Sequence, residues 1–242
     1  MQKIDAAHEA EELRGELADL IYAISHDFNA PLRHIDGFAK LIKKNNSEVL
    51  DEQSLGHLNN IISSSERLSA ILNGILSLSR INTRPEEYER VDLSELVKGL
   101  LAEREILGPT DSTNQVELGD LPVISCDREQ VTLALNALLE NAFLYKKEDE
   151  PNLIQLSHVV DDYGVKVSIS DQGIGVDSRY FKEIFKPLRR AVSQSDFPGD
   201  GIGLAIVDKV MHRHNGSVQI ESVVDKGTKI TLVFPLDVTE ND

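Results

Sequence analysis

A histidine and an aspartate stand side by side at His26 and Asp27, within a segment whose apolar residues recur at helical intervals. At about 100° per residue, the imidazole of His26 points roughly opposite that apolar stripe and is predicted to face solvent. A carboxylate that bonds one ring nitrogen fixes the tautomer and leaves the other nitrogen to attack an electrophile. Pro31 cannot donate an amide hydrogen to the carbonyl of Asp27, which predicts a kink just after the pair. The competing interpretation is an ordinary surface histidine.

Segments that could bind a ligand recur in the second half of the chain. Asn141, in LLENAF, has an amide oxygen of the kind that Mg²⁺ accepts beside phosphate and water. Asp171 opens DQGIG after an apolar run, and its carboxylate can accept a hydrogen bond from an exocyclic amine. The glycine-rich PGDGIGLAI (198–206) leads into a helix, whose first amides and dipole suit phosphate groups. Taken singly, the first two also fit a helix-surface asparagine and an ordinary Asp-Gly turn.

A long helical hairpin is predicted to carry His26. The first helix runs from about Lys3 to Lys44 and the second from about Leu55 to Ile81, joined by the polar NNSEVLDEQS. Two long amphipathic helices with a short connector form an antiparallel hairpin, which cannot cover its own apolar stripe. Pairing with a second copy into a four-helix bundle is therefore expected. The stripe on the first helix comprises Leu13, Leu17, Leu20, Ile24, Phe28, Ile35, Phe38 and Ile42.

A second folded region is predicted after a polar linker. Residues 1–82 are assigned to the hairpin, residues 83–90, which include a proline, to the linker, and residues 91–242 to a separate domain. In that domain short apolar runs alternate with helical patterns, one entered through Asp92 or Ser94 and one opened by Asp127. LIQLSHVV and VKVSIS are joined across DDYG as a strand hairpin. Helices mixed with antiparallel strands predict an α/β sandwich, so the expected fold class of the whole chain is α+β.

Composition narrows the function classes. The 242 residues are 40 % hydrophobic and carry a formal net charge of −16, which argues against nucleic-acid binding because such a surface needs a basic patch. No apolar run approaches the length of a membrane span and the amino terminus is charged, so neither membrane insertion nor a signal peptide is expected. The single cysteine, Cys126, excludes an internal disulfide and suits a reducing compartment. A cytoplasmic protein is predicted.

These motifs, in this order, resemble those of sensor histidine kinases. HDFNAPL is similar to the phosphoacceptor box of that family, LLENAF to its N box, and DQGIG and PGDGIGLAI to its two glycine boxes. The intervening YFKEIFKPLRRAVSQSDF resembles the phenylalanine box and lid, with Phe185 and Leu188 as its anchors. Together the motifs cover nearly the whole chain. The resemblance implies a phosphoacceptor hairpin of the HisKA type followed by an ATP-binding domain of the GHKL type, which DNA gyrase and Hsp90 share.

The resemblance also implies roles for individual residues. His26 is the expected phosphoacceptor with Asp27 as its partner, Asn141 is the expected Mg²⁺ ligand, and Asp171 the group that reads the adenine amine. Arg190 is expected to meet the nucleotide phosphates, although its basic cluster also fits a solvated helix face. The full set of expected nucleotide-binding residues is Asn141, Asp171, Gly173, Gly175, Arg190, Gly201, Gly203 and Leu204.

A protein of this kind uses Mg²⁺-ATP to phosphorylate His26 and passes the phosphoryl group to an aspartate of a response regulator receiver domain. The resemblance further implies a homodimer and an upstream sensor domain or protein. Two alternatives stay open. Ala30, Ala137 and Leu144 depart from the family pattern, which leaves room for a catalytically degenerate, nucleotide-binding dimeric scaffold. A hydrolytic ATPase of the same superfamily would need a glutamate base four residues before Asn141, where Ala137 stands.

Overall fold

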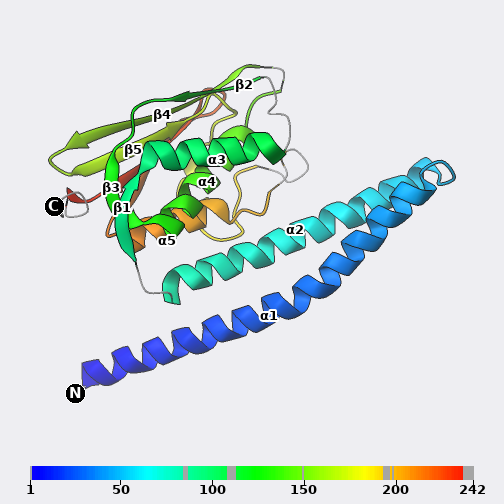
Figure 1. The fold of residues 1–242 in the computed structure, drawn as a ribbon, viewed down its shortest axis with the longest axis horizontal. Coiled ribbons are helices and arrows are strands. Elements are labelled where there is room, and N and C mark those ends of the chain that lie inside the picture. Colours follow the sequence, from blue (N-terminus) through cyan, green and yellow to red (C-terminus); the bar gives the residue numbers. More distant parts are fainter. Residues whose placement is uncertain are drawn as a thin grey trace. The chain divides into compact units, whose positions relative to one another are not determined.

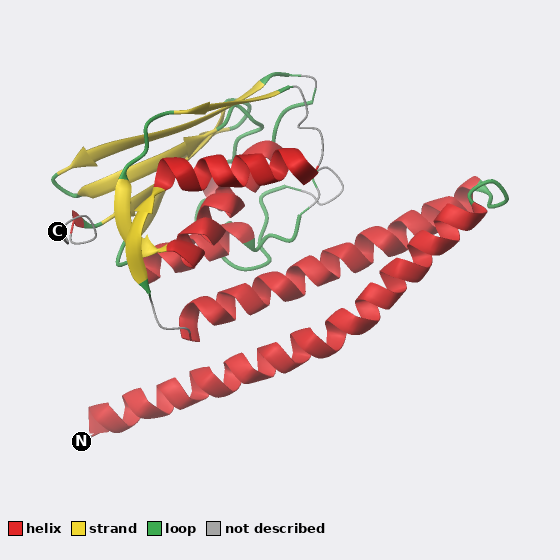
Figure 2. Ribbon diagram, viewed as in Figure 1, coloured by secondary structure: helices red, strands yellow, loops and turns green. Residues whose placement is uncertain are grey.

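The computed structural model describes residues 2–83, 87–107, 113–148, 150–192, 197 and 199–236. Contacts within the chain divide it into two units, Met1–Arg84 and Pro85–Asp242, which are described separately. The first unit consists of two helices and their connecting turn, and the second combines helices with strands (Figure 1, Figure 2). The chain is therefore α+β, as predicted. Of the helices in the described ranges, none has the length and apolar character needed to cross a membrane.

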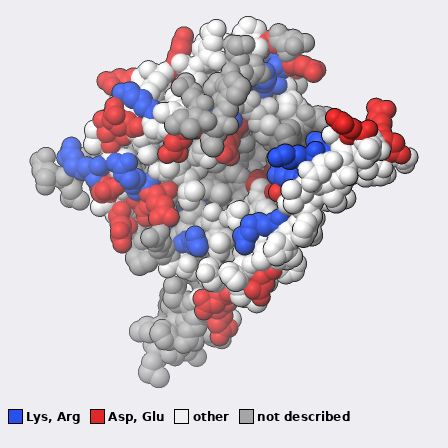
Figure 3. All heavy atoms as spheres, turned by 45° about the vertical axis from the view of Figure 1, so that its right-hand side comes forward, with Lys and Arg blue, Asp and Glu red and all other residues white. Residues whose placement is uncertain are grey.

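Acidic and basic side chains are interspersed over the face of the molecule drawn in Figure 3. The basic side chains stand at several separate places there, and acidic ones lie among them. The chain as a whole carries a formal net charge of −16. A polyphosphate ligand would therefore depend on groups placed close to it rather than on the field of the whole protein.

Two long helices form the first unit. α1 spans Gln2–Asn46 and α2 spans Glu52–Thr83, and both are slightly longer at their ends than predicted. Asp51 caps the second helix, because its Oδ1 accepts a hydrogen bond from the amide of Ser54 at 2.7 Å. The short turn between the helices reverses the chain, so the hairpin expected from the two amphipathic patterns is present (Figure 1).

The predicted apolar stripe of α1 is left largely uncovered by α2. Its eight residues are 42–65 % exposed within the single chain. The face of α1 that meets α2 instead contains small and polar residues, and Ser25, Leu32 and Ala39 are buried there. The exposure of the stripe agrees with the expectation that one hairpin alone cannot cover its own apolar stripe. α1 has two contact faces, and the more apolar one, here called the outer stripe, is left uncovered within the chain.

The helix α1 continues through Pro31 without a break. The ribbon bends along its length in Figure 1, and the residues before and after the proline belong to one helix. Pro31 lacks the amide hydrogen that the carbonyl of Asp27 would accept, so one internal hydrogen bond is lost there. The kink expected after His26 takes the form of a bend within a continuous helix.

A two-stranded sheet opens the second unit. β1 (Tyr88–Asp92) pairs antiparallel with β3 (Val123–Asp127). The side chain of Val91 in β1 is fully buried. Residues 88–90, predicted to be linker, therefore belong to the folded unit. The polar composition of this strand misled the prediction, because most of its side chains are exposed and pairing of its backbone does not depend on them.

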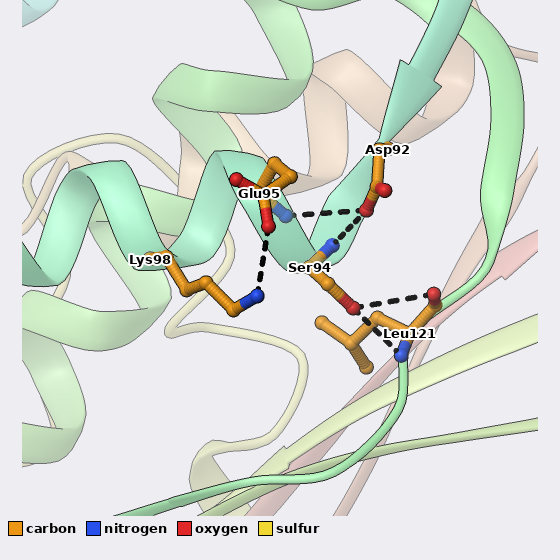
Figure 4. Close-up of polar contacts among 5 residues, drawn as sticks. All are labelled: Asp92, Ser94, Glu95, Lys98 and Leu121. Carbon is orange, nitrogen blue, oxygen red and sulfur yellow. Dashed lines mark hydrogen bonds and ion pairs between the residues drawn. The ribbon is translucent and has the colours of Figure 1, made fainter.

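The helix α3 (Leu93–Leu107) follows directly and is capped by Asp92. Its Oδ1 accepts hydrogen bonds from the amides of Ser94 and Glu95 at 2.8 and 3.1 Å, as the helix start predicted at this point requires (Figure 4). The hydroxyl of Ser94 in turn accepts from the amide of Leu121 at 3.0 Å and lies 3.3 Å from its carbonyl oxygen. One cap thus fixes both the helix and the loop that enters β3.

A five-stranded sheet forms the other layer of this unit. The strands run in the order β2-β4-β5-β7-β6, with β2 parallel to β4 and the remaining neighbours antiparallel. The helices of the unit lie on one face of this sheet (Figure 1, Figure 2). The predicted α/β sandwich is therefore present. The strands are Asn114–Leu118 (β2), Asn152–Asp161 (β4), Gly164–Ser170 (β5), Ser217–Val223 (β6) and Gly227–Phe234 (β7).

Two further helices of this unit carry Asn141 and the end of the glycine-rich segment. α4 spans Arg128–Leu144 and α5 spans Gly203–Arg213. Asp127 caps α4, since its Oδ1 accepts from the amide of Gln130 at 3.0 Å, which confirms the predicted helix start. The core beneath these helices is formed by buried apolar side chains, among them Val131, Leu135, Leu138, Ile154, Leu156, Val167, Ile169, Val207, Met211 and Leu232.

Candidate functional site

The imidazole of His26 stands in solvent on α1. Its side chain is 74 % exposed, and its Nδ1 lies 3.1 Å from Oδ1 of Asp27, which is 78 % exposed. Side chains at adjacent helix positions usually diverge, so this contact means that the two lean toward each other. The ring of Tyr22, one turn earlier, lies nearly parallel to the imidazole with centroids 6.5 Å apart. Nδ1 is thus engaged, and Nε2 is the nitrogen that can react.

The two residues at Asn29 and Ala30, in the next turn of α1, direct no polar side-chain group toward His26. Asn29 places its Nδ2 3.4 Å from Oδ1 of Asn73 on α2, so its amide faces the second helix. Ala30, four residues after the histidine, has only a methyl group, which neither donates nor accepts a hydrogen bond.

In the second unit, Asp171 stands just after β5 with a partly buried carboxylate. Its Oδ1 accepts hydrogen bonds from the amides of Gly173 and Thr228 at 2.9 and 3.2 Å. Burial raises the pKa of the Asp171 carboxyl to about 6, and the bonds from the two amides oppose that rise. Because both amides bond Oδ1, Oδ2 is the oxygen that can accept a hydrogen bond from a ligand.

Two glycines of DQGIG are required by close backbone contacts. A Cβ at Gly173 would lie 2.2 Å from the carbonyl oxygen of Tyr145, just after α4. Gly175 has a φ of +67°, and a Cβ there would lie 2.1 Å from the carbonyl oxygen of Val223. The amide of Ile174 donates to the same Tyr145 carbonyl at 2.9 Å. The loop is therefore pressed between the end of α4 and the end of β6, where only glycine fits at these two positions.

A buried asparagine that the sequence did not single out ties this loop to α4. Asn152 is 1 % exposed, and its Nδ2 donates to the carbonyl of Ala142 at 2.8 Å and to Oδ1 of Asn114 at 2.9 Å. Its own Oδ1 accepts from the amide of Gln172 at 3.1 Å. No motif marks Asn152, since an asparagine at the head of an apolar run is typical of a turn. It nevertheless fixes the residue beside Asp171 to the helix that carries Asn141.

The end of the glycine-rich loop lies against α4, close to Asn141. A Cβ at Gly203 would lie 3.4 Å from Cβ of Ala137 and 4.0 Å from Nδ2 of Asn141, so α5 begins against the middle of α4. The residue before α5, Ile202, makes no side-chain capping bond. The first amides of α5, at Gly203 and Leu204, are therefore in the position at which helices bind anions.

Arg190 holds the backbone of the loop before α5. Its guanidinium donates to the carbonyl oxygens of Gly199, at 3.1 Å, and of Phe197. A Cβ at Gly201 would lie 3.0 Å from Cγ of Arg190, which places that glycine against the arginine stem. The ring of Phe197 packs on that of Tyr145, with centroids 5.4 Å apart. The contact of Arg190 with a phosphate group stays a prediction.

One of the two lid anchors expected from the resemblance is wrong. Leu188 is 50 % exposed and has a φ of +62°, and its amide donates to the carbonyl of Gly201 at 2.9 Å. The backbone turns into the left-handed region to make this bond, which sends the side chain outward. Among the described residues of this segment, Ile184 is the buried apolar one, at 6 % exposed.

Two family models match the chain, one on each unit. Residues 16–84 match the His Kinase A (phospho-acceptor) domain, and residues 126–238 match the histidine kinase-, DNA gyrase B- and HSP90-like ATPase family. The first range contains His26, and the second contains Asn141, Asp171 and the glycine-rich loop. The geometry described above and the two models therefore divide the chain in the same way.

Curated relatives match along nearly the whole chain. Phytochrome-like protein Cph1 of Synechocystis sp. is 24 % identical over 95 % of this chain, and cyanobacterial phytochrome B of Nostoc sp. is 29 % identical over 94 %. Sensor histidine kinase ZraS of Escherichia coli O157:H7 is 25 % identical over 93 %. The chain spans only 30 % of the length of each phytochrome and 48 % of ZraS.

Solved structures share the fold. Full-length ShkA in complex with AMPPNP aligns with a TM-score of 0.65 at 21 % identity, covering 90 % of this chain and 45 % of that one. The Acinetobacter baumannii histidine kinase AdeS aligns with a TM-score of 0.58 at 20 % identity, covering 85 % of this chain and 95 % of that one. The two family models together with this fold show that the chain belongs to the sensor histidine kinases, whose catalytic core it comprises.

Proposed function

We propose that this chain is an ATP-dependent protein-histidine kinase that phosphorylates its own His26 and passes the phosphoryl group to an aspartate of a response regulator receiver domain. The observation that carries the proposal is the exposed His26–Asp27 pair, in which Nδ1 lies 3.1 Å from the carboxylate. It supports an imidazole held in one tautomer with Nε2 as the nucleophile.

The transfer step needs few protein groups. Nε2 of neutral His26 forms a bond to the γ-phosphorus of ATP as the bond from that phosphorus to the bridging oxygen of ADP breaks. The proton on Nδ1 stays in its hydrogen bond to Asp27, whose negative charge stabilises the positive charge that develops on the ring. Positioning and charge neutralisation supply most of the rate in such phosphoryl transfers. The exposure of both side chains supports this role, because a second domain must reach the histidine.

The nucleotide contacts proposed for the second unit come from its glycine loops, the first amides of α5 and a few side chains. Oδ2 of Asp171 accepts from the adenine amine, while Gly173 and Gly175 let the loop lie close to the ring. The amides at Gly203 and Leu204 bind the phosphates, and Gly201 shapes the turn before them. Arg190, whose guanidinium holds the backbone of that loop, is the further proposed phosphate contact. The support comes from the bonds that fix Asp171 and from the uncapped start of α5.

Mg²⁺ fits this arrangement through Asn141. No cluster of three or more histidine, cysteine or acidic side chains that could hold a metal occurs within the described ranges. Mg²⁺ suits such a site because it takes few protein ligands and completes its shell with phosphate oxygens and water. The side chain of Asn141 lies beside the start of α5, where phosphates are expected. When bound, the ion would neutralise phosphate charge.

A homodimer is the state in which we propose that the kinase works. The outer stripe of α1 presents eight apolar side chains that are 42–65 % exposed, and a second hairpin would cover them in a four-helix bundle. A receiver domain is the proposed partner in phosphotransfer, and an upstream sensor domain or protein supplies the signal. We place the kinase in the cytoplasm, where ATP is available.

Two other functions make different predictions for one experiment. The protein is incubated with Mg²⁺ and γ-labelled ATP, and the protein-bound label is then tested for stability in acid and in base. A histidine kinase gives label that is lost in acid and kept in base. A hydrolytic ATPase releases phosphate and gives no bound label, and its expected base is missing because Ala137 packs at that position. A degenerate scaffold binds ATP but gives neither product, which would refute the proposal.

A further inference from the structure

The helix that carries His26 is weakened close to that residue. Pro31 leaves the carbonyl of Asp27 without its usual helical donor, although α1 continues through the proline. A helix that has lost one internal bond bends more easily at that point. The position of the imidazole therefore depends on what holds the segment from Asp27 to Leu32 against α2.

A buried hydroxyl on α2 makes that contact. Oγ of Ser65 donates to the carbonyl oxygen of Leu32, directly after Pro31, at 2.9 Å. Both residues are buried, with Ser65 4 % and Leu32 7 % exposed. A buried hydroxyl that loses its partner costs more than one exposed to water, so this bond favours a single arrangement of the two helices. It therefore specifies where the segment after the proline lies.

Among the polar contacts that the structure describes between the two helices, this bond is distinguished by its burial. The side chains of the outer stripe stay 42–65 % exposed, although Ile35 lies beside Ile61 and Leu68 of α2. The polar pairs Asn29–Asn73, at 3.4 Å, and Lys40–Glu66, at 2.6 Å, also join α1 to α2 but are exposed. Exposed polar pairs contribute little because water competes for them. The bond from Ser65 is thus the polar contact best able to fix the segment at Pro31.

Building on the proposed kinase activity, we infer that Ser65 is a positioning residue for phosphorylation of His26. Its hydroxyl holds the carbonyl just beyond the proline, which is the fixed end from which the turn that bears the imidazole departs. This role is exerted through the backbone of α1 and does not involve binding the nucleotide. Its loss should lower the rate of the transfer step and leave ATP binding unchanged.

The test compares two serines on the same helix. Ser65→Ala removes the bond to α1, whereas Ser63→Ala removes a hydroxyl whose partner is the carbonyl of Asn60 in its own helix, at 3.2 Å. Each full-length variant is shown to be a folded dimer by circular dichroism and light scattering before assay. Ser65→Ala should lower kcat for phosphohistidine formation about two- to tenfold, the range that one net hydrogen bond supports, with KM for ATP unchanged. Ser63→Ala should match the wild type.

A second comparison asks whether the effect depends on the proline. Pro31→Ala restores an amide donor to the carbonyl of Asp27, so the helix needs less support from α2. Ser65→Ala should therefore cost less in a Pro31→Ala background than in the wild type. An equal loss in both backgrounds would overturn the inference. So would loss of the folded dimer in Ser65→Ala that Pro31→Ala does not restore, because the serine would then support the hairpin as a whole.

Failure of this inference is distinct from failure of the proposed function. If the wild type forms no acid-labile phosphate, the kinase proposal falls. If the wild type is phosphorylated and Ser65→Ala proceeds at the rate of Ser63→Ala, only the role of Ser65 is refuted.

Discussion

Replacing Asp171 with asparagine should weaken ATP binding and stabilise the fold at the same time. The substitution is nearly isosteric, and an amide oxygen can still accept from the amides of Gly173 and Thr228. The second position of the side chain changes from an acceptor to a donor, which faces the donating amine of adenine. Loss of a charged hydrogen bond costs about 1.5–3 kcal/mol, so the affinity for ATP should fall about tenfold to a hundredfold.

The gain in stability follows from the burial of the carboxylate. A carboxyl whose pKa rises from 3.8 to about 6 costs about 3 kcal/mol to ionise within the fold, at about 1.4 kcal/mol per pKa unit. The native state holds its proton up to higher pH than the unfolded state, so this cost is absent below pH 4 and complete above pH 6. Asp171→Asn removes it, and at pH 8 the free energy of unfolding should rise by about 1–3 kcal/mol.

Urea unfolding at several pH values measures this change. Tyrosine fluorescence reports mainly on the second unit, because Tyr88, Tyr145, Tyr163 and Tyr180 lie in it. The advantage of the variant over wild type should shrink as the pH is lowered from about 6 to about 4. A variant that is no more stable than wild type at pH 8, or whose advantage does not vary with pH, would refute the account of this carboxylate.

Three further substitutions test other parts of the structure. In Gly175→Ala the alanine must adopt a φ of +67° and its Cβ meets the carbonyl oxygen of Val223, so calorimetry should show at least tenfold weaker ATP binding. Gly99→Ala is the control, because a Cβ there has no atom within 4 Å, and it should bind ATP normally. Equal affinities of the two variants would contradict the packing of the loop. Asn152→Ala leaves buried partners unpaired and should lower the free energy of unfolding by about 2–4 kcal/mol in urea, and a loss under 1 kcal/mol would contradict its proposed role. Ala30→Thr supplies a hydroxyl one turn after His26, which can orient a water molecule to hydrolyse the phosphoaspartate of a receiver domain, so phosphate release should speed up about tenfold; no change would mean that another group orients the water.

The sequence predicted the elements well where local patterns decide them. Helix starts were predicted at Asp92 or Ser94 and at Asp127, and both aspartates accept hydrogen bonds from amides in the first turn. DDYG was predicted to join two strands, and β4 and β5 pair across it. In each case the signal lies within a few residues, because a cap or a turn satisfies backbone groups next to it.

The predictions that failed depend on contacts that are distant in the sequence. Periodicity revealed the outer stripe of α1 but not that Ser25, Leu32 and Ala39 are the residues buried within the single chain. Residues 88–90 appeared to be linker because the strand they form is paired through its backbone with β3. Asn152 joins Ala142 and Gln172 through a side chain with no local signature. A single sequence does not report such long-range pairing.

The central claim is that His26 receives the phosphoryl group, and two matched variants test it directly. His34 lies on the same helix and packs against Phe38, with ring centroids 6.4 Å apart, but it has no adjoining acid. Each variant, His26→Gln and His34→Gln, is incubated with γ-labelled ATP and Mg²⁺, and ATP affinity is measured in parallel. His26→Gln should carry no acid-labile label and bind ATP as the wild type does, while His34→Gln should be labelled normally. Acid-labile label that persists in His26→Gln and disappears in His34→Gln would contradict the account.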